Sequence, residues 1–150
     1  MGLRNYLFGK EKKFTDNKIG ILKSRIKNEN PSINHTWTGE SLLPDQKKKT
    51  VFILEGNFRG PYKNQLESVH RIIEGLNSII QKIQIEINNN KPVKTQLSKD
   101  WIKGFYLAAI TPMEIRETKF EVTFEPLNDK DTGYIGLIWE NGKITEIEVK

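Results

Sequence analysis

The sequence predicts an α+β fold in which an antiparallel sheet of about six or seven strands packs against one long amphipathic helix, in the order βββ-α-ββββ. Between residues 63 and 88, apolar side chains recur at alternating intervals of three and four residues, the spacing of one helical face. Short segments rich in β-branched and aromatic residues lie on both sides of this helix. Near the end of the chain, Asn141-Gly142 joins two such segments, and this dipeptide is a strong signal for a hairpin turn.

Three strands are expected before the helix. The segments 18–26 and 33–43 are separated by Asn28-Glu29-Asn30-Pro31, a cluster typical of turns, and they are expected to form a hairpin. The apolar run 51–54 predicts a third, buried strand, which ends at Gly56 and Gly60-Pro61.

The helical stripe consists of residues at successive steps of three and four, namely Leu66, Val69, Ile73, Leu76, Ile80, Ile83 and Ile87. Ile72, Ile79 and Ile85 lie off this stripe, so the helix is expected either to be covered on more than one side or to offer a second face to a partner. Gly75 weakens the helix locally, by about 1 kcal/mol relative to alanine. A short helical turn is expected within residues 97–103.

Four strands are expected after the helix, at 105–110, 119–125, 135–140 and 143–149. The second of them alternates apolar and polar residues, which predicts one buried and one wet face. In the final hairpin, a two-residue loop would place Ile135, Leu137, Trp139 and Ile144 on one face with Glu146 and Glu148, and Tyr134, Ile138, Ile147 and Val149 on the other. The pattern leaves open which of these two faces is buried.

Length and composition indicate one domain, expected at residues 14–150. Residues 1–13, which end in Lys10-Glu11-Lys12-Lys13, are expected to be a flexible basic segment. The alternative is a membrane-surface or partner-binding helix carrying Leu3, Tyr6, Leu7 and Phe8. The chain has no cysteine, no secretory signal pattern and no stretch approaching a membrane span, so a cytoplasmic location is expected.

The formal net charge of +5 is unevenly distributed. Residues 1–50 carry eleven Lys/Arg against five acids, residues 51–110 eight against five, and residues 111–150 five against nine. The last part of the chain is therefore acidic. Such asymmetry can steer a charged partner, and it also serves solubility.

Residue types that carry catalysis or hold metals are sparse. His35 and His70 are the only histidines, and neither has a neighbour at the spacing of a zinc site. Residues 128–133 begin like a calcium loop, but Gly133 occupies the fifth ligand position and the required glutamate at the twelfth is absent. The sequence also lacks a GxSxG elbow and a glycine-rich phosphate loop. No catalytic residue, metal site or cofactor is therefore expected, and enzymatic activity is disfavoured.

Several short motifs carry a family resemblance that spans residues 14–150. They are Ile19-Gly20-Ile21-Leu22, Trp37-Thr38-Gly39, Gly60-Pro61 before the helix, Phe124-Glu125-Pro126, Asp129-Lys130-Asp131 and Glu140-Asn141-Gly142-Lys143-Ile144. With them the chain resembles small uncharacterised bacterial α+β domains, some of which are encoded beside polymorphic toxins and are taken to be immunity proteins. The resemblance implies a non-enzymatic bacterial cytoplasmic module, and it assigns no functional residues.

The favoured function is binding of a protein partner, with toxin neutralisation by occlusion as its most concrete form. An acidic surface is expected to meet a basic site on that partner, through Glu121, Glu125, Asp129, Asp131 and Glu140. One alternative is a small-ligand-binding or enzymatic domain, whose pocket would be lined by His35, Trp37 or Trp101. The other is a weak nucleic-acid binder that uses Lys47 to Lys49 and Arg59. The sequence leaves the partner's identity, the strand order and the oligomeric state open.

Overall fold

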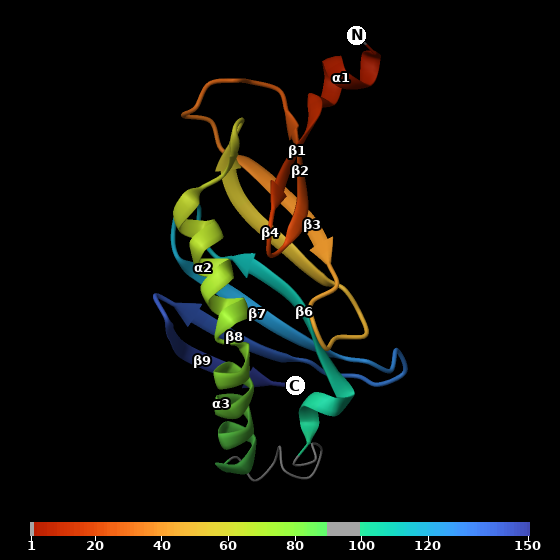
Figure 1. Cartoon of the computed structure of the whole chain (residues 1–150), viewed down its shortest axis with the longest axis vertical. Coiled ribbons are helices and arrows are strands. Elements are labelled where there is room, and N and C mark those ends of the chain that lie inside the picture. The colour runs from red at the N-terminus through yellow and green to blue at the C-terminus, as the bar shows by residue number, and fades with distance from the viewer. Residues whose placement is uncertain (1, 90–99) are drawn as a thin grey trace.

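One sheet runs through the whole molecule. The computed structural model describes residues 2–89 and 100–150. Within them the sheet has nine strands, β1 (Lys10–Asp16), β2 (Gly20–Ile26), β3 (His35–Ser41), β4 (Thr50–Asn57), β5 (Gly60–Pro61), β6 (Phe105–Pro112), β7 (Lys119–Pro126), β8 (Ile135–Glu140) and β9 (Lys143–Val149). The strand order is β1-β2-β3-β4-β6-β7-β8-β9, and the short β5 pairs with β4 (Figure 1). The α+β class and the mostly antiparallel sheet are confirmed.

The sheet consists of two antiparallel four-stranded meanders, β1–β4 and β6–β9, that meet side by side. They join through β4 and β6, the one parallel pair among the described strands, with Val51 opposite Ala109 and Phe52 opposite Ile110. Parallel neighbours need a crossover connection, because a tight turn can only reverse the chain. The helical segment between β5 and β6 provides this crossover. It allows β6, the first strand of the second meander, to lie parallel to β4, the last strand of the first.

The crossover contains two helices, whereas the sequence predicted one. Helix α2 (Lys63–Glu74) ends at Gly75, and α3 (Leu76–Asn89) begins directly after it. Gly75 adopts φ −91° and ψ 10°, outside the α-helical values, and its N–H group donates a hydrogen bond to the Arg71 carbonyl at 2.9 Å. The glycine that was expected only to weaken the helix therefore interrupts it. Both helices lie against the same side of the sheet (Figure 1).

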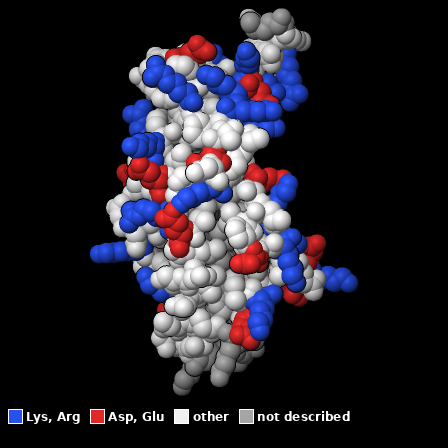
Figure 2. All heavy atoms as spheres, in the orientation of Figure 1, with Lys and Arg blue, Asp and Glu red and all other residues white. Residues whose placement is uncertain are grey.

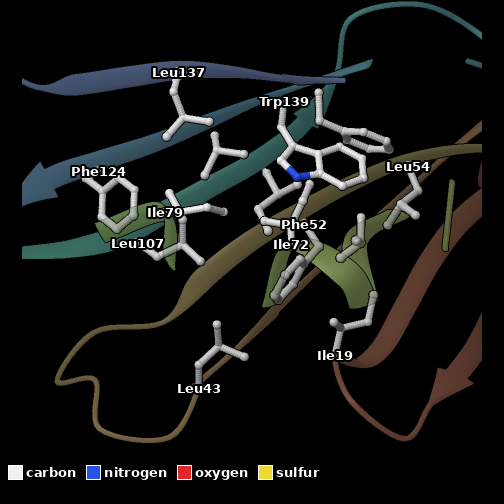
Figure 3. Packing of buried hydrophobic residues seen from close by; sticks show 14 of the residues in the cluster. Ile19, Leu43, Phe52, Leu54, Ile72, Ile79, Leu107, Phe124, Leu137 and Trp139 are labelled. Carbon is white, nitrogen blue, oxygen red and sulfur yellow. The ribbon is translucent and has the colours of Figure 1, made fainter. Parts of the chain in front are cut away.

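The buried side of these helices is rotated relative to the predicted stripe. Ile72 and Ile79, which lie off the stripe, are almost completely buried, together with Val69, Ile83 and Ile87. Four stripe residues are only partly buried at the margin of the core, Leu66, Ile73, Leu76 and Ile80. Figure 3 shows Ile72 and Ile79 among core residues of the strands, including Phe52, Leu107 and Leu137. Ile85 is exposed, so the side of α3 that carries it is not covered by the described residues.

The final hairpin contains a β-bulge that changes which residues face the core. Trp139 pairs with Ile144 as predicted, but Ile138 pairs with Glu146, so Thr145 is an extra residue in β9. Beyond the bulge the alternation of β9 is inverted. Ile147 and Val149 therefore pack against the core with Ile135, Leu137 and Trp139, and Glu146 and Glu148 are exposed. The prediction that these two glutamates share a face with Trp139 is wrong.

Two further strands were not predicted, the edge strand β1 and the short strand β5. The helix α1 (Leu3–Phe8) lies where the sequence offered a helix only as the alternative to a flexible segment. Charged residues are typical of edge strands, where they oppose pairing with another chain, and they obscure the apolar alternation that identifies a strand. Lys10 to Lys13 pair with Lys23 to Ile26 of β2, so these four residues belong to the sheet and not to a segment outside the domain. The predicted helical turn at 97–103 corresponds in part to the 3₁₀ helix η1 (Trp101–Gly104), and residues 97–99 lie outside the described residues.

Candidate functional site: an acidic face of the sheet

The side of the sheet opposite α2 and α3 carries the acidic residues of the C-terminal meander. In β7 the apolar residues Phe120, Val122 and Phe124 are fully buried beneath the helices. Successive side chains of a strand point to opposite faces, so Glu121, Thr123 and Glu125 lie on the other side. Both glutamates are exposed. The predicted alternation of this strand therefore places two of the five candidate residues on one open surface.

Four of the five predicted residues come together. Glu121, Glu125, Asp129 and Asp131 line one hollow of about 550 Å³, formed by β7 and the loop that connects it to β8. Thr123, Pro126, Asn128, Gly133 and Tyr134 complete its lining. Asn128 shapes the loop, because its carbonyl oxygen accepts the N–H of Asp131 at 3.0 Å and its side chain accepts the N–H of Lys130 at 3.1 Å.

Glu140 does not belong to this group. It lies at the hairpin end of β8, opposite Lys119, which is two positions along β7 from Glu121, and it does not line the hollow. Glu125, at the far end of β7, is six positions from Lys119, which corresponds to roughly 20 Å along an extended strand. Glu140 instead lies near Glu117, whose pKa is raised mainly by the neighbouring Glu114 and further by Glu140. Glu140 therefore lies outside the hollow that the other four acids line, and its part in binding a partner stays a prediction.

Two acidic residues were missed by the sequence analysis. Glu146 and Glu148 of β9 line a smaller hollow of about 110 Å³ together with Glu121, on the face of β7–β9 that carries Ile138. Their period-two spacing in 143–149 was visible in the sequence, but a regular hairpin places them on the wrong side. The bulge at Thr145 brings them next to Glu121. We call Glu121, Glu125, Asp129, Asp131, Glu146 and Glu148 the acidic face.

Some carboxylates of the acidic face already have partners within the chain. Lys48, from the loop between β3 and β4, contacts Asp129 with 2.6 Å between Nζ and Oδ1, and this ion pair lowers the pKa of Asp129. The Tyr106 hydroxyl lies 3.3 Å from Glu125 Oε2, and burial, followed by the charge of Glu125, raises the pKa of Tyr106. The Tyr134 hydroxyl donates to Glu148 at 2.9 Å and, with Lys150, lowers the pKa of Glu148.

Glu121 and Asp131 differ from these residues. Within the described part of the chain, neither side chain makes a hydrogen bond or an ion pair, although both are exposed. Glu146 is likewise exposed and makes no such contact with the described residues. These three are therefore the carboxylates of the acidic face that are available to an external cation, and the face combines three internally paired acids with three unpaired ones.

The described residues contain no group of three or more His, Cys, Asp or Glu side chains that could hold a metal ion. His70 contacts Asp16, and His35 is a half-buried residue of β3. Trp37 is completely buried and donates its indole N–H to the Asn57 carbonyl at 3.0 Å, so its ring is part of the core. The side-chain contacts of His70 and Trp37 are thus made within the fold.

A different hollow of about 640 Å³ bears on the small-ligand alternative. It lies between the start of α3, η1 and the β3–β4 loop, and its apolar lining is Leu76, Ile80, Ile102, Phe105, Phe124 and Leu127. The predicted residues His35, Trp37 and Trp101 do not line it. Trp101 packs behind it, with its ring 5.8 Å from that of Phe105 and 5.3 Å from that of Phe124.

The lysine run expected to contact nucleic acid is largely engaged in ion pairs. Lys48 pairs with Asp129, and Lys49 pairs with Glu40 at 3.2 Å. Arg59 lies over the ring of Phe58, with 5.2 Å between its guanidinium carbon and the ring centroid. Lys48 and Lys49 are therefore already paired with acids of the chain, which reduces the positive charge that this loop offers to a phosphate backbone.

Comparison of the chain with protein-family models, with curated proteins and with solved structures found no match. The family resemblance drawn from the sequence motifs therefore stays a prediction. Among the described residues, none of the helices has the length and apolar character needed to span a lipid bilayer.

Proposed function

We propose that the protein binds a basic surface of a partner protein through the acidic face. The observation that carries this proposal is that β7, the loop after it and β9 bring six carboxylates together on the side of the sheet that the helices leave open. Four of these residues come from β-strands of a sheet with a continuous buried core, so the surface is rigid before a partner arrives. A preorganised charged surface loses little conformational entropy on binding.

The chemistry of the partner follows from that of the acidic face. Carboxylates without an internal partner favour lysine and arginine side chains, and arginine can pair with a carboxylate through two parallel hydrogen bonds. Complementary charge increases the association rate and makes binding sensitive to salt. Glu121, Asp131 and Glu146 are expected to contribute most, because they need not exchange an existing internal contact for an external one.

Toxin neutralisation in a bacterial cytoplasm is the most concrete form of this proposal. It rests on the sequence resemblance to domains taken to be immunity proteins, and the acidic face supplies a mechanism. Covering a basic functional surface of a toxin would block access of that toxin's own anionic substrate. Inhibition would then be by occlusion and would need no catalytic residue in this chain.

The test compares two charge-reversal variants of equal net charge. Glu121→Lys/Asp131→Lys alters the acidic face, and Glu67→Lys/Glu86→Lys alters exposed acids of α2 and α3 on the opposite side of the sheet. A partner captured by the wild-type protein from its native cell is purified, and its affinity for each variant is measured at low and high salt. We expect the first variant to lose about tenfold or more in affinity and the second to bind like wild type.

Equal affinity of both variants for the partner, or affinity of the wild type that is independent of salt, would contradict the proposal. Thermal unfolding of both variants serves as the folding control, because all four substituted side chains are exposed and the unfolding temperature is expected to change little.

A further inference from the structure

The helix α1 exposes an unusual amount of apolar surface for its size. Four of its six residues are large and apolar or aromatic, and their exposed fractions are 73% for Leu3, 78% for Tyr6, 46% for Leu7 and 59% for Phe8. The helix contains no buried residue. Single exposed apolar residues are common on protein surfaces, but a contiguous group of them marks a site of interaction. Figure 1 shows α1 at one end of the molecule, projecting beyond the strands.

The same end of the molecule is strongly basic. Residues 1–30 carry eight Lys/Arg against three acids, which equals the net charge of +5 of the entire chain, so the other 120 residues are neutral in sum. Figure 2 shows the blue Lys and Arg side chains gathered at the end that carries α1, β1 and β2. Apolar and cationic groups are therefore combined at this end and separated from the acidic face.

The position of α1 next to these cations is determined by its connection to the sheet. Gly9 links α1 to β1 with φ +81°, and a Cβ atom there would lie 2.6 Å from the carbonyl carbon and oxygen of Ile26. The Arg25 guanidinium donates a hydrogen bond to the Gly9 carbonyl at 2.9 Å. The lysines Lys10, Lys12 and Lys27 line one hollow of about 740 Å³ together with Tyr6 of α1. Lysine ammonium groups and the exposed face of α1 thus lie close together.

We propose that this end binds the surface of an anionic lipid bilayer, with α1 lying in the interface. Short helices with exposed leucine and aromatic residues and with adjacent lysines bind membranes in this way, because the apolar side chains enter the boundary region and the lysines contact lipid phosphates. A nucleic acid would match the lysines but would leave Leu3, Leu7 and Phe8 in water. Attachment at this end would direct the acidic face away from the negatively charged membrane. The proposal does not depend on the function proposed for the acidic face.

The test is sedimentation of the full chain with vesicles of phosphatidylcholine alone and of phosphatidylcholine mixed with phosphatidylserine. Leu7→Gln/Phe8→Gln removes apolar contacts, and Lys10→Gln/Lys27→Gln removes charge. The matched controls are Ile85→Gln/Ile115→Gln, which removes similarly exposed apolar residues elsewhere, and Lys63→Gln/Lys82→Gln. We expect the wild type and both controls to bind the mixed vesicles, and each α1-end variant to bind them about tenfold or more weakly.

Absence of binding to the mixed vesicles, or equal binding to both vesicle types, would overturn the proposal. The proposal would also be overturned if Leu7→Gln/Phe8→Gln bound the mixed vesicles as tightly as the wild type. Lysines alone would then account for the attraction, and a soluble polyanion would be the better partner. Since no α1 residue is buried, these substitutions leave the folded core intact, and circular dichroism of each variant verifies this.

Discussion

The imidazole of His70 on α2 contacts the carboxylate of Asp16, the last residue of β1, with 3.0 Å from Nε2 to each carboxylate oxygen. Asp16 Oδ1 also accepts the backbone N–H groups of Lys18 at 2.8 Å and Ile19 at 2.9 Å. The Asp16 side chain is only 7% exposed. One carboxylate therefore shapes the turn of the edge hairpin and attaches that hairpin to the crossover helix.

We expect Asp16→Asn to lower the free energy of unfolding near neutral pH by about 1–2 kcal/mol and Asp16→Ala to lower it further. Asparagine keeps an acceptor for the two backbone N–H groups but loses the charge that faces His70. Alanine loses every one of these hydrogen bonds and leaves the buried donors unpaired. Urea unfolding of the three proteins measures the difference. Equal stability of the wild type and Asp16→Ala would show that this carboxylate does not hold the turn.

The contribution of Asp16 should also depend on pH. Burial raises the pKa of Asp16, but the hydrogen bonds from Ile19, Lys18 and His70 lower it more, so the pKa in the folded state lies below the ordinary pKa of an aspartate. Stabilisation by the carboxylate is then complete above the pKa of the unfolded chain, about 3.9, and is lost as the pH falls through the lower pKa of the folded state. We expect the stability difference between wild type and Asp16→Asn to decrease only below about pH 4. A difference that already disappears near pH 6 would contradict this assignment.

Substitutions of Ile72 and Ile85 test which side of the crossover helices is buried. Ile72 has no exposed surface, whereas Ile85 is 58% exposed. We expect Ile72→Ala to lower the free energy of unfolding by about 2–5 kcal/mol, because it removes buried methyl groups and leaves a cavity. Ile85→Ala is the matched control and should change stability by less than about 0.5 kcal/mol. Chemical denaturation measures both, and similar losses would mean that both residues are buried.

Gly56 marks a close approach of two backbone segments. A Cβ atom at this position would lie 2.1 Å from the Gly60 carbonyl oxygen and 2.6 Å from the Pro61 Cα atom, across the β4–β5 pair. We expect Gly56→Ala to lower the free energy of unfolding by about 2 kcal/mol or more, since backbone atoms must move apart. Gly104→Ala is the control, because a Cβ atom there has no neighbour within 4 Å. Thermal unfolding compares the two, and an unfolding temperature for Gly56→Ala equal to that of the control would refute the close approach.

The bulge at Thr145 makes a prediction about deletions. Removing Thr145 leaves Trp139 opposite Ile144 and Ile138 opposite Glu146, so every other pair keeps its register. We expect this deletion to preserve the fold. Deletion of Ile147 should instead destabilise the protein strongly, because it directs a glutamate of β9 toward the core. Near-ultraviolet circular dichroism and thermal unfolding separate these outcomes. If the deletion of Thr145 unfolds the protein while that of Ile147 does not, the register is different.

The ion pair between Lys48 and Asp129 predicts a change in titration. The hydrogen bond and the charge of Lys48 lower the pKa of Asp129. We expect Lys48→Met to raise the pKa of Asp129 toward its ordinary value. Lys130→Met, next to Asp129 in the loop, is the control and should leave the pKa nearly unchanged. Titration followed by carbon-detected NMR of the aspartate carboxyl groups gives both values, and an unchanged pKa in Lys48→Met would exclude the pair in solution.

Local patterns in the sequence determined most of the strands and the existence of the helical segment. The alternation of Phe120, Val122 and Phe124 predicted the buried side of β7, and Asn141-Gly142 predicted the hairpin of β8 and β9. The same alternation placed Glu121 and Glu125 on one open face, because a period of two is a property of the extended backbone and needs no distant contact.

Tertiary structure decided the features that depend on distant contacts. The parallel pairing of β4 with β6 joins segments more than 50 residues apart, and no local pattern encodes it. Ile72 and Ile79 face the core because the sheet covers that side of α2 and α3, although helical spacing alone favoured another stripe. Glu146 and Glu148 join the acidic face because packing of Ile147 and Val149 into the core favours a bulge at Thr145. The sequence by itself determined which residues alternate and where the chain turns, since these follow from backbone geometry. Only the tertiary structure decided which faces are buried, since that depends on what packs against them.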